Sequence, residues 1–174
     1  QELGRRYVES CREVFDWMER CMDTCPVGDL IPCLSELAGN PCSDEEVYAI
    51  YPNYGAVVAM RNFAEIARDC DLPEDAERLH NLSFRLMDGM LSALVSRGEQ
   101  ERTKVPAGVW LNGLDKRGEC YEEANFGARF AIHHWTRQAP FIQNFDAGLN
   151  TLEEDDAKKV HIASYEYLRH EMAK

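Results

Sequence analysis

The sequence has 174 residues and a formal net charge of −12, with 31 acidic against 19 basic side chains. A chain of this length buries a hydrophobic core and is expected to form a single helical domain over 1–174. The acidic balance argues against direct binding to nucleic acid or to an anionic membrane surface, since both need a basic patch, and no run of about 18 apolar residues could span a membrane.

The first predicted element is a long helix over Glu2–Thr24. Its apolar residues recur at steps of four and three, which is coiled-coil-like spacing; they are Tyr7, Cys11, Val14, Met18, Cys21 and Cys25. Pro26 ends this helix, because proline lacks the N–H that a helix interior requires. A second, short helix is predicted over 29–38, and Ser43 with Glu46 has the spacing of a capping box that would open a third.

The cysteine content of the chain is high for its length, with seven in total. The spacing of Cys21, Cys25, Cys33 and Cys42 does not match the short CxxC pairs of zinc fingers. Disulfides Cys21–Cys33 and Cys11–Cys42 could bridge a helical hairpin and would indicate secretion. The alternative, which we favour, is a set of reduced thiols buried along helix seams, with an intracellular location.

A helical hairpin is predicted at the centre of the fold, over 55–69 and 75–97. Apolar residues of the first helix recur at three and four positions, and those of the second cover more than one side. The second helix is therefore expected to lie between neighbours. Asp71 and Glu74 have capping-box spacing, and Gly89 indicates a close helix crossing.

The last third of the chain begins with a long loop, 98–118, which carries large apolar residues and is expected to be ordered. A small β-hairpin is compatible with it, with strands near 103–111 and a turn at Asn112-Gly113. Helices are predicted over 119–138 and 152–174, the second with an acidic first turn and a basic last turn that suit the helix dipole. The fold class is therefore all-α, a compact bundle of five to six helices with one long ordered loop.

A metal site was considered at Glu77 and His80. This ExxH pair resembles the local ligand unit of carboxylate-bridged di-iron bundles, and Glu65 lies on the preceding helix. The second pair that such a site needs is missing, because Glu166 and His170 are four residues apart rather than three. Neither a metal nor another cofactor is expected.

A nuclease-like element was considered at Arg129, His133 and His134. It resembles the R-x4-H element of HEPN-type ribonucleases, which are helical bundles. The resemblance implies that the histidines act as acid or base and that the arginine holds a phosphate. Phe130 replaces the polar residue usual after the arginine, and the acidic balance disfavours RNA.

A carbohydrate-type element was considered at Trp110, Asn112 and Asp115. Together with the glycines around them, these residues resemble one repeat of the (α/α)-barrel sugar epimerases, over about 25 of the 174 residues. The resemblance implies stacking of a sugar on Trp110, with Asp115 nearby as a candidate catalytic group. Glu123, on the helix that follows, is a further ligand-binding candidate.

The function predicted from these features is that of an acidic helical interaction module, without an assigned catalytic activity, whose partner is a protein and could be a basic one. The alternative is a small all-α enzyme or ligand-binding domain with its site near loop 98–118 and the helix 119–138. An interaction module should present a partly apolar surface patch, and an enzyme a pocket with converging polar groups.

Overall fold

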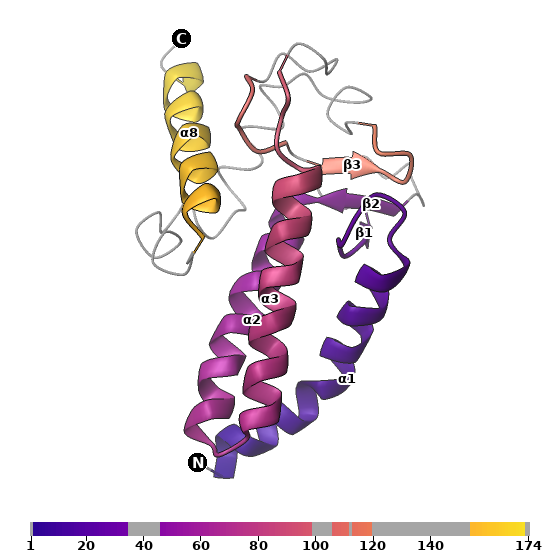
Figure 1. Ribbon diagram of the computed structural model, residues 1–174, viewed down its shortest axis with the longest axis vertical. Helices are drawn as coiled ribbons and strands as arrows, with labels where there is room; N and C mark the ends of the chain where they lie inside the picture. The colour runs from indigo at the N-terminus through magenta and orange to yellow at the C-terminus, as the bar shows by residue number, and fades with distance from the viewer. Residues whose placement is uncertain (1, 35–45, 99–105, 112, 120–153, 173–174) are drawn as a thin grey trace.

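The computed structural model describes residues 2–34, 46–98, 106–111, 113–119 and 154–172 (Figure 1). Helices dominate, as predicted, but a small antiparallel sheet corrects the all-α class. The described residues hold four helices rather than five to six. In chain order, the elements are α1 (Glu2–Thr24), β1 (Cys33–Leu34), β2 (Glu46–Ala49), α2 (Ile50–Asp69), α3 (Pro73–Ala93), β3 (Gly113–Asp115) and α8 (Asp155–Met172).

The hairpin of α2 and α3 is the centre of the fold, as predicted. The two helices lie side by side, with α1 along one flank and α8 near the end that carries the sheet (Figure 1). The apolar arc of α3 is broad, and its large buried apolar side chains are Leu79, Leu82, Leu86, Met87 and Met90. They pack with Val57, Met60 and Ala64 of α2 in one cluster.

The turn between α2 and α3 differs from the predicted capping box. Asp71 adopts a left-handed conformation with φ of 56°, and the N–H of Leu72 donates to the carbonyl of Ala67 at 2.9 Å. The N–H of Asp71 donates to the carbonyl of Arg68, which completes a Schellman motif at the end of α2. Asp71 therefore ends one helix instead of starting the next, and Pro73 occupies the first turn of α3 without a side-chain cap before it.

The sheet replaces two predicted helices. Residues 29–32 are irregular and 33–34 form β1, so the helix expected over 29–38 is wrong where the chain is described. The capping box at Ser43–Glu46 was expected to open a helix, but 46–49 form β2, which pairs antiparallel with β1 and β3. Val47, Tyr48 and Ala49 are all almost fully buried, as in a central strand covered on both faces.

The loop after α3 also differs from its prediction. Gly113 does not turn a hairpin but pairs with Ala49 inside β3. A Cβ at Gly113 would lie 3.0 Å from the Cα of Ala49, so a larger residue there would have to push the two strands apart by a few tenths of an ångström. Trp110 instead forms a bridge with Val95, just beyond α3. Residues 103–105 and 112 of the predicted hairpin lie outside the described residues.

The final helix agrees with the prediction in position and polarity. Asp155 and Asp156 lie in the first turn of α8, and Arg169 and His170 in its last turn. The predicted helix 119–138 lies almost wholly outside the described residues. Within the described chain, no helix is both long and apolar enough to cross a membrane.

Helix α1 has the predicted bounds but buries a different row of side chains. Val8, Phe15 and Met22, spaced by seven residues, are the buried ones. Tyr7 and Val14 of the predicted row are 60% and 48% exposed. The three cysteines and the methionine of that row, Cys11, Cys21, Cys25 and Met18, are partly buried at the edge of the core.

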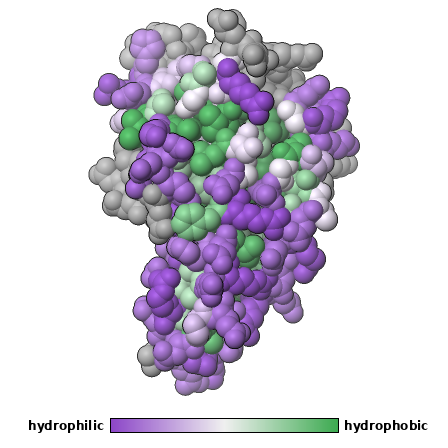
Figure 2. All heavy atoms as spheres, in the orientation of Figure 1, coloured by the Kyte–Doolittle hydropathy of each residue, from purple (hydrophilic) through white to green (hydrophobic). Residues whose placement is uncertain are grey.

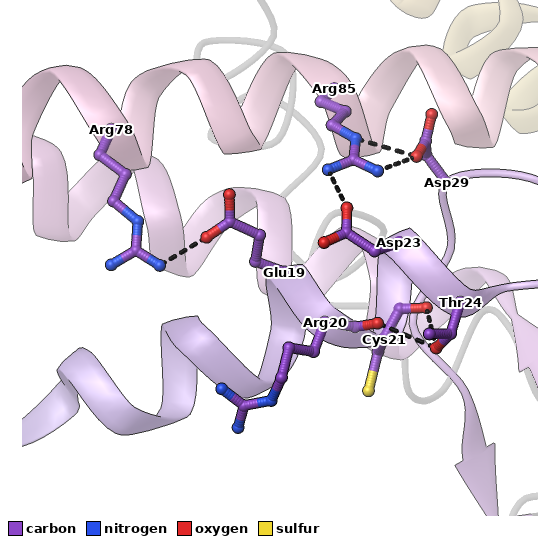
Figure 3. Close-up of polar contacts among 8 residues, drawn as sticks. All are labelled: Glu19, Arg20, Cys21, Asp23, Thr24, Asp29, Arg78 and Arg85. Atoms are coloured by element: carbon purple, nitrogen blue, oxygen red, sulfur yellow. Dashed lines mark hydrogen bonds and ion pairs between the residues drawn. The ribbon is translucent and has the colours of Figure 1, made fainter.

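Ion pairs fix α1 against α3. Arg78 Nη2 lies 2.6 Å from carboxylate oxygens of both Asp16 and Glu19. Arg85 Nη1 lies 2.8 Å from Asp23 and its Nε donates to Asp29 at 2.9 Å (Figure 3). Each exposed pair stabilises by only about 0–1 kcal/mol, so their main effect is to fix the rotation of α1 about its own axis.

The cysteines of the described residues are reduced thiols. Cys11, Cys21, Cys25, Cys33 and Cys70 are all free of disulfides. The pairs Cys21–Cys33 and Cys11–Cys42 are therefore wrong, although Cys42 itself lies outside the described residues. Four of these thiols are partly buried and Cys70 is buried. Burial raises the pKa of Cys33 above its usual value.

The chain leaves α1 and crosses the central hairpin at residues 28–31. The side-chain amide of Asn53, fully buried on α2, binds both backbone groups of Ile31: its Oδ1 accepts from the N–H at 2.8 Å and its Nδ2 donates to the carbonyl at 3.0 Å. On α3, the backbone of Asp29 lies against Gly89. Gly89 thus marks a close approach, as predicted, but to a loop rather than to another helix.

Because of this crossing, two glycine-to-alanine substitutions should change the stability of the protein in opposite directions. Gly89→Ala places a Cβ on the carbonyl oxygen of Asp29, which is backbone and cannot turn away, so we expect destabilisation by about 1–3 kcal/mol. Gly55→Ala in α2 is the matched control, because a Cβ there meets no described atom within 4 Å. Gly55→Ala should raise the free energy of unfolding by about 0.5–1 kcal/mol, because alanine has a higher helix propensity than glycine.

Urea denaturation followed by circular dichroism measures both values. Stabilisation by Gly89→Ala comparable to that by Gly55→Ala would show that the Asp29 backbone does not lie against α3.

Candidate functional site

Two of the candidate residues from the sequence, Trp110 and Asp115, lie in the described part of the chain. Asn112, Glu123, Arg129, His133 and His134 lie outside the described residues, so their roles remain predictions.

Trp110 is buried between the sheet end of α3 and α8. Its side chain is 5% exposed, and its backbone N–H donates to Ser164 Oγ of α8 at 2.9 Å. The indole Nε1 meets no hydrogen-bond partner among the atoms described. In this conformation the ring contributes to the core, and stacking of a sugar would require it to move outward.

Asp115 organises the turn that follows β3. Its Oδ1 accepts the backbone N–H groups of Arg117 and Glu119 at 2.8 and 3.0 Å, and its Oδ2 accepts Arg117 Nε at 2.9 Å. Burial alone would raise the pKa of Asp115, but these hydrogen bonds and the Arg117 charge hold that pKa below its usual value. A carboxylate stabilised in its charged form suits turn formation and the placement of Arg117 better than proton transfer.

Helix α8 joins the hairpin through polar residues that the sequence analysis did not single out. Arg61 of α2, 8% exposed, binds both carboxylate oxygens of Glu154 at 2.8 and 3.0 Å, just before α8 begins. Arg61 Nε also donates to Ser83 Oγ of α3 at 3.3 Å, and its guanidinium lies over the ring of Phe84. In the sequence, the only indication of this site is that Arg61 occupies a position of α2 at which the helical period otherwise places apolar residues.

His161 of α8 lies beside this ion pair along the same interface. It is 1% exposed and stacks on Tyr54, with ring centroids 5.8 Å apart. Burial lowers the pKa of His161 to about 4, because the charged imidazolium is poorly solvated there. A neutral histidine of this kind serves packing at neutral pH and responds to acid.

The described surface of α1 carries a row of exposed apolar side chains, which we call the outer row: Leu3, Tyr7, Val14 and Trp17. Their exposed fractions are 72%, 60%, 48% and 46%. At 100° per residue, the outer row and the residues that pair with α3 lie on opposite sides of the buried line Val8–Phe15–Met22. The contacts of α1 with the hairpin therefore leave the outer row uncovered.

A pocket of about 460 Å³ lies at the other end of the molecule, beside the sheet. The described residues that line it come from three segments: the turn after α1, the end of α3 and the loop around β3. On the face shown in Figure 2, hydrophobic atoms gather toward this end, whereas the opposite end is largely hydrophilic.

The proposed metal ligands of the sequence analysis are not assembled into a site. Glu77 is exposed, and His80 packs edge-on against Phe84 with centroids 4.7 Å apart. Glu65 pairs with Arg68 at the surface. Among the described residues, no group of three or more His, Cys, Asp or Glu side chains could hold a metal ion.

Comparisons with known protein families, with curated proteins and with solved structures found no match.

The burial of His161 predicts how stability depends on pH. Its pKa is about 4 in the folded chain and about 6.5 unfolded, so the unfolded chain binds the proton more readily between these values and stability falls as pH falls. Between pH 7 and pH 5 this amounts to about 2 kcal/mol.

Chemical denaturation at pH 7 and pH 5 tests this dependence. His161→Phe keeps an aromatic ring against Tyr54. It should remove most of the loss of stability between pH 7 and pH 5, whatever its effect on stability at pH 7. His170→Gln, at an exposed position of the same helix, should retain the wild-type loss. An unchanged loss in His161→Phe would assign the pH dependence to other groups.

Proposed function

We propose that this chain is a helical protein-interaction module that binds its partner through the outer row of α1. The observation that carries the proposal is the row itself: four large apolar side chains exposed along one side of a helix that is tied to α3 by ion pairs on another side. Several large apolar side chains exposed along one side of a helix are typical of interaction sites.

The spacing of the outer row favours a helical partner. Leu3, Tyr7, Val14 and Trp17 are separated by four, seven and three residues, with Ser10 at the intervening position. These are the a and d positions of a heptad, the pattern by which one helix packs along another. An amphipathic helix of the partner would fit such a row, with Tyr7 and Trp17 as the residue types that contribute most to binding energy.

The charge of the module favours a basic partner. The chain carries a net charge of −12, and Glu9 and Glu13 are exposed on α1 itself. Two basic side chains near these residues are ion-paired: Arg6 with Glu2 at 2.8 Å and Arg12 with Asp75 at 2.7 Å. A negative field of this kind increases the rate of encounter with a basic partner and disfavours acidic ones.

Substitution in the outer row tests the proposal. The protein purified with its partner from its own source should lose that partner when Tyr7 and Trp17 are both changed to Ser. Titration with the isolated partner should show a dissociation constant at least about 30-fold higher, equivalent to the loss of about 2 kcal/mol at interface hot spots.

The matched control is Ile162→Ser, which removes an apolar side chain of similar exposure, 43%, from α8. It should change the dissociation constant by less than about twofold. The free energy of unfolding of both variants should lie within about 0.5 kcal/mol of the wild-type value, because the substituted residues are exposed. A partner that binds the Tyr7/Trp17 variant as tightly as the wild type would contradict the proposal.

A further inference from the structure

The geometry points to a conformational switch: acidification releases α8 from the hairpin while α1, α2 and α3 remain packed together. The residues that join α8 to the rest of the described fold include a carboxylate, an imidazole and a hydroxyl, those of Glu154, His161 and Ser164. None of these contacts involves the outer row, so the switch is independent of the proposed protein interaction.

Helix α8 adds small residues to the core rather than large ones. Among its described residues, the buried member of the main core cluster is Ala157, and Val160 packs against that cluster while only partly buried. The large buried side chains of the cluster lie on α1, α2, α3, the sheet and the loop around β3. Release of α8 therefore leaves these large side chains in contact with one another, and such a partial opening costs less than global unfolding.

Polar contacts flank the buried histidine along the chain. Before it, the carboxylate of Glu154 binds Arg61 of α2 at 2.8 and 3.0 Å. After it, Ser164 Oγ accepts the backbone N–H of Trp110 at 2.9 Å. His161 itself is 1% exposed, so a charge formed on its ring has to be desolvated for as long as α8 stays docked.

The groups contributed by α2 do not compensate a charge on His161. Tyr54 stacks on the imidazole ring and is neutral at these pH values. Arg61, about two turns further along α2, carries a positive charge of its own and engages both oxygens of Glu154.

The groups on α3 and in the loop before β3 are neutral or can only become positive. On α3, Ser83 accepts from Arg61, and His80 packs against Phe84, the ring over which Arg61 lies. From the loop, Trp110 contributes a neutral backbone donor. None of these groups supplies a negative charge that would stabilise a protonated histidine in the docked helix.

The direction of the switch follows from the two environments of His161. Burial lowers the pKa of the docked imidazole to about 4, whereas an exposed imidazole has a pKa of about 6.5. The contribution of His161 to docking is therefore fully present above about pH 6.5 and is lost as the pH falls toward 4. Between pH 7 and pH 5, the ratio of released to docked α8 should rise by about 20-fold.

Hydrogen exchange of backbone amides, followed by mass spectrometry at pH 7 and pH 5 and corrected for intrinsic exchange rates, tests the switch. A helix of 18 residues is marginally stable alone in water, so released α8 loses the protection of its amides. At each pH, we expect the opening of α8 to be at least about tenfold more populated than that of α2 and α3. It should also be about 20-fold more populated at pH 5 than at pH 7.

Two substitutions separate the titration of His161 from docking itself. His161→Phe keeps a ring against Tyr54 and should reduce the ratio between the two pH values to less than about threefold. Glu154→Gln weakens the contact with Arg61, so it should increase the opening of α8 at pH 7 by about tenfold and retain the pH dependence. His170→Gln, at an exposed position of α8, is the matched control and should behave as the wild type.

Four results would overturn the inference: equal protection of α8 and the hairpin, an α8 opening that is equally populated at pH 7 and pH 5, an unchanged pH dependence in His161→Phe, or an unchanged opening in Glu154→Gln. Because none of these variants alters the outer row, failure here leaves the proposed protein interaction unaffected.

Discussion

The crossing of the chain over the α2–α3 hairpin at residues 28–31 is the constraint on which the remaining structure depends. At this point the backbone must pass over buried helix surface, where its polar groups cannot reach water. Asn53 supplies the hydrogen bonds that Ile31 would otherwise lack, and Gly89 leaves the room that Asp29 occupies. Because the crossing fixes where the chain leaves α1 and where β1 begins, it also fixes the position of the sheet.

The exposed outer row and the pocket beside the sheet both follow from this arrangement. Helix α1 is tied to α3 by carboxylates on one side of its buried line, so the apolar residues on the other side face outward. The turn that follows α1 then forms one wall of the pocket, against the end of α3 and the loop around β3.

The sequence predicts the helices of this protein better than its sheet or its sites. In the α2–α3 hairpin and in α8, apolar residues recur with the helical period over many turns. Such a pattern can be recognised from neighbouring residues alone. The pairing of Val47 with Asp115 is non-local, so the acidic capping pattern before β2 was misleading. On α1, two neighbouring rows are both apolar, and periodicity alone does not distinguish Val8 and Phe15 from Tyr7 and Val14. The pocket was not predictable from local sequence, because its lining comes from three segments joined only by the fold.

The separation of contacts along the chain has a consequence for folding. The contacts between α2 and α3 join neighbouring segments, whereas the sheet joins residue 33 to residue 47 and residue 47 to residue 115, and Arg61 reaches Glu154. Closing such long loops costs entropy before any contact is gained, so we expect the hairpin to form first and to serve as the template for the sheet. The order of folding then differs from the order of synthesis. Helix α1 is synthesised before the hairpin, but it can bury its apolar residues only after the hairpin has formed.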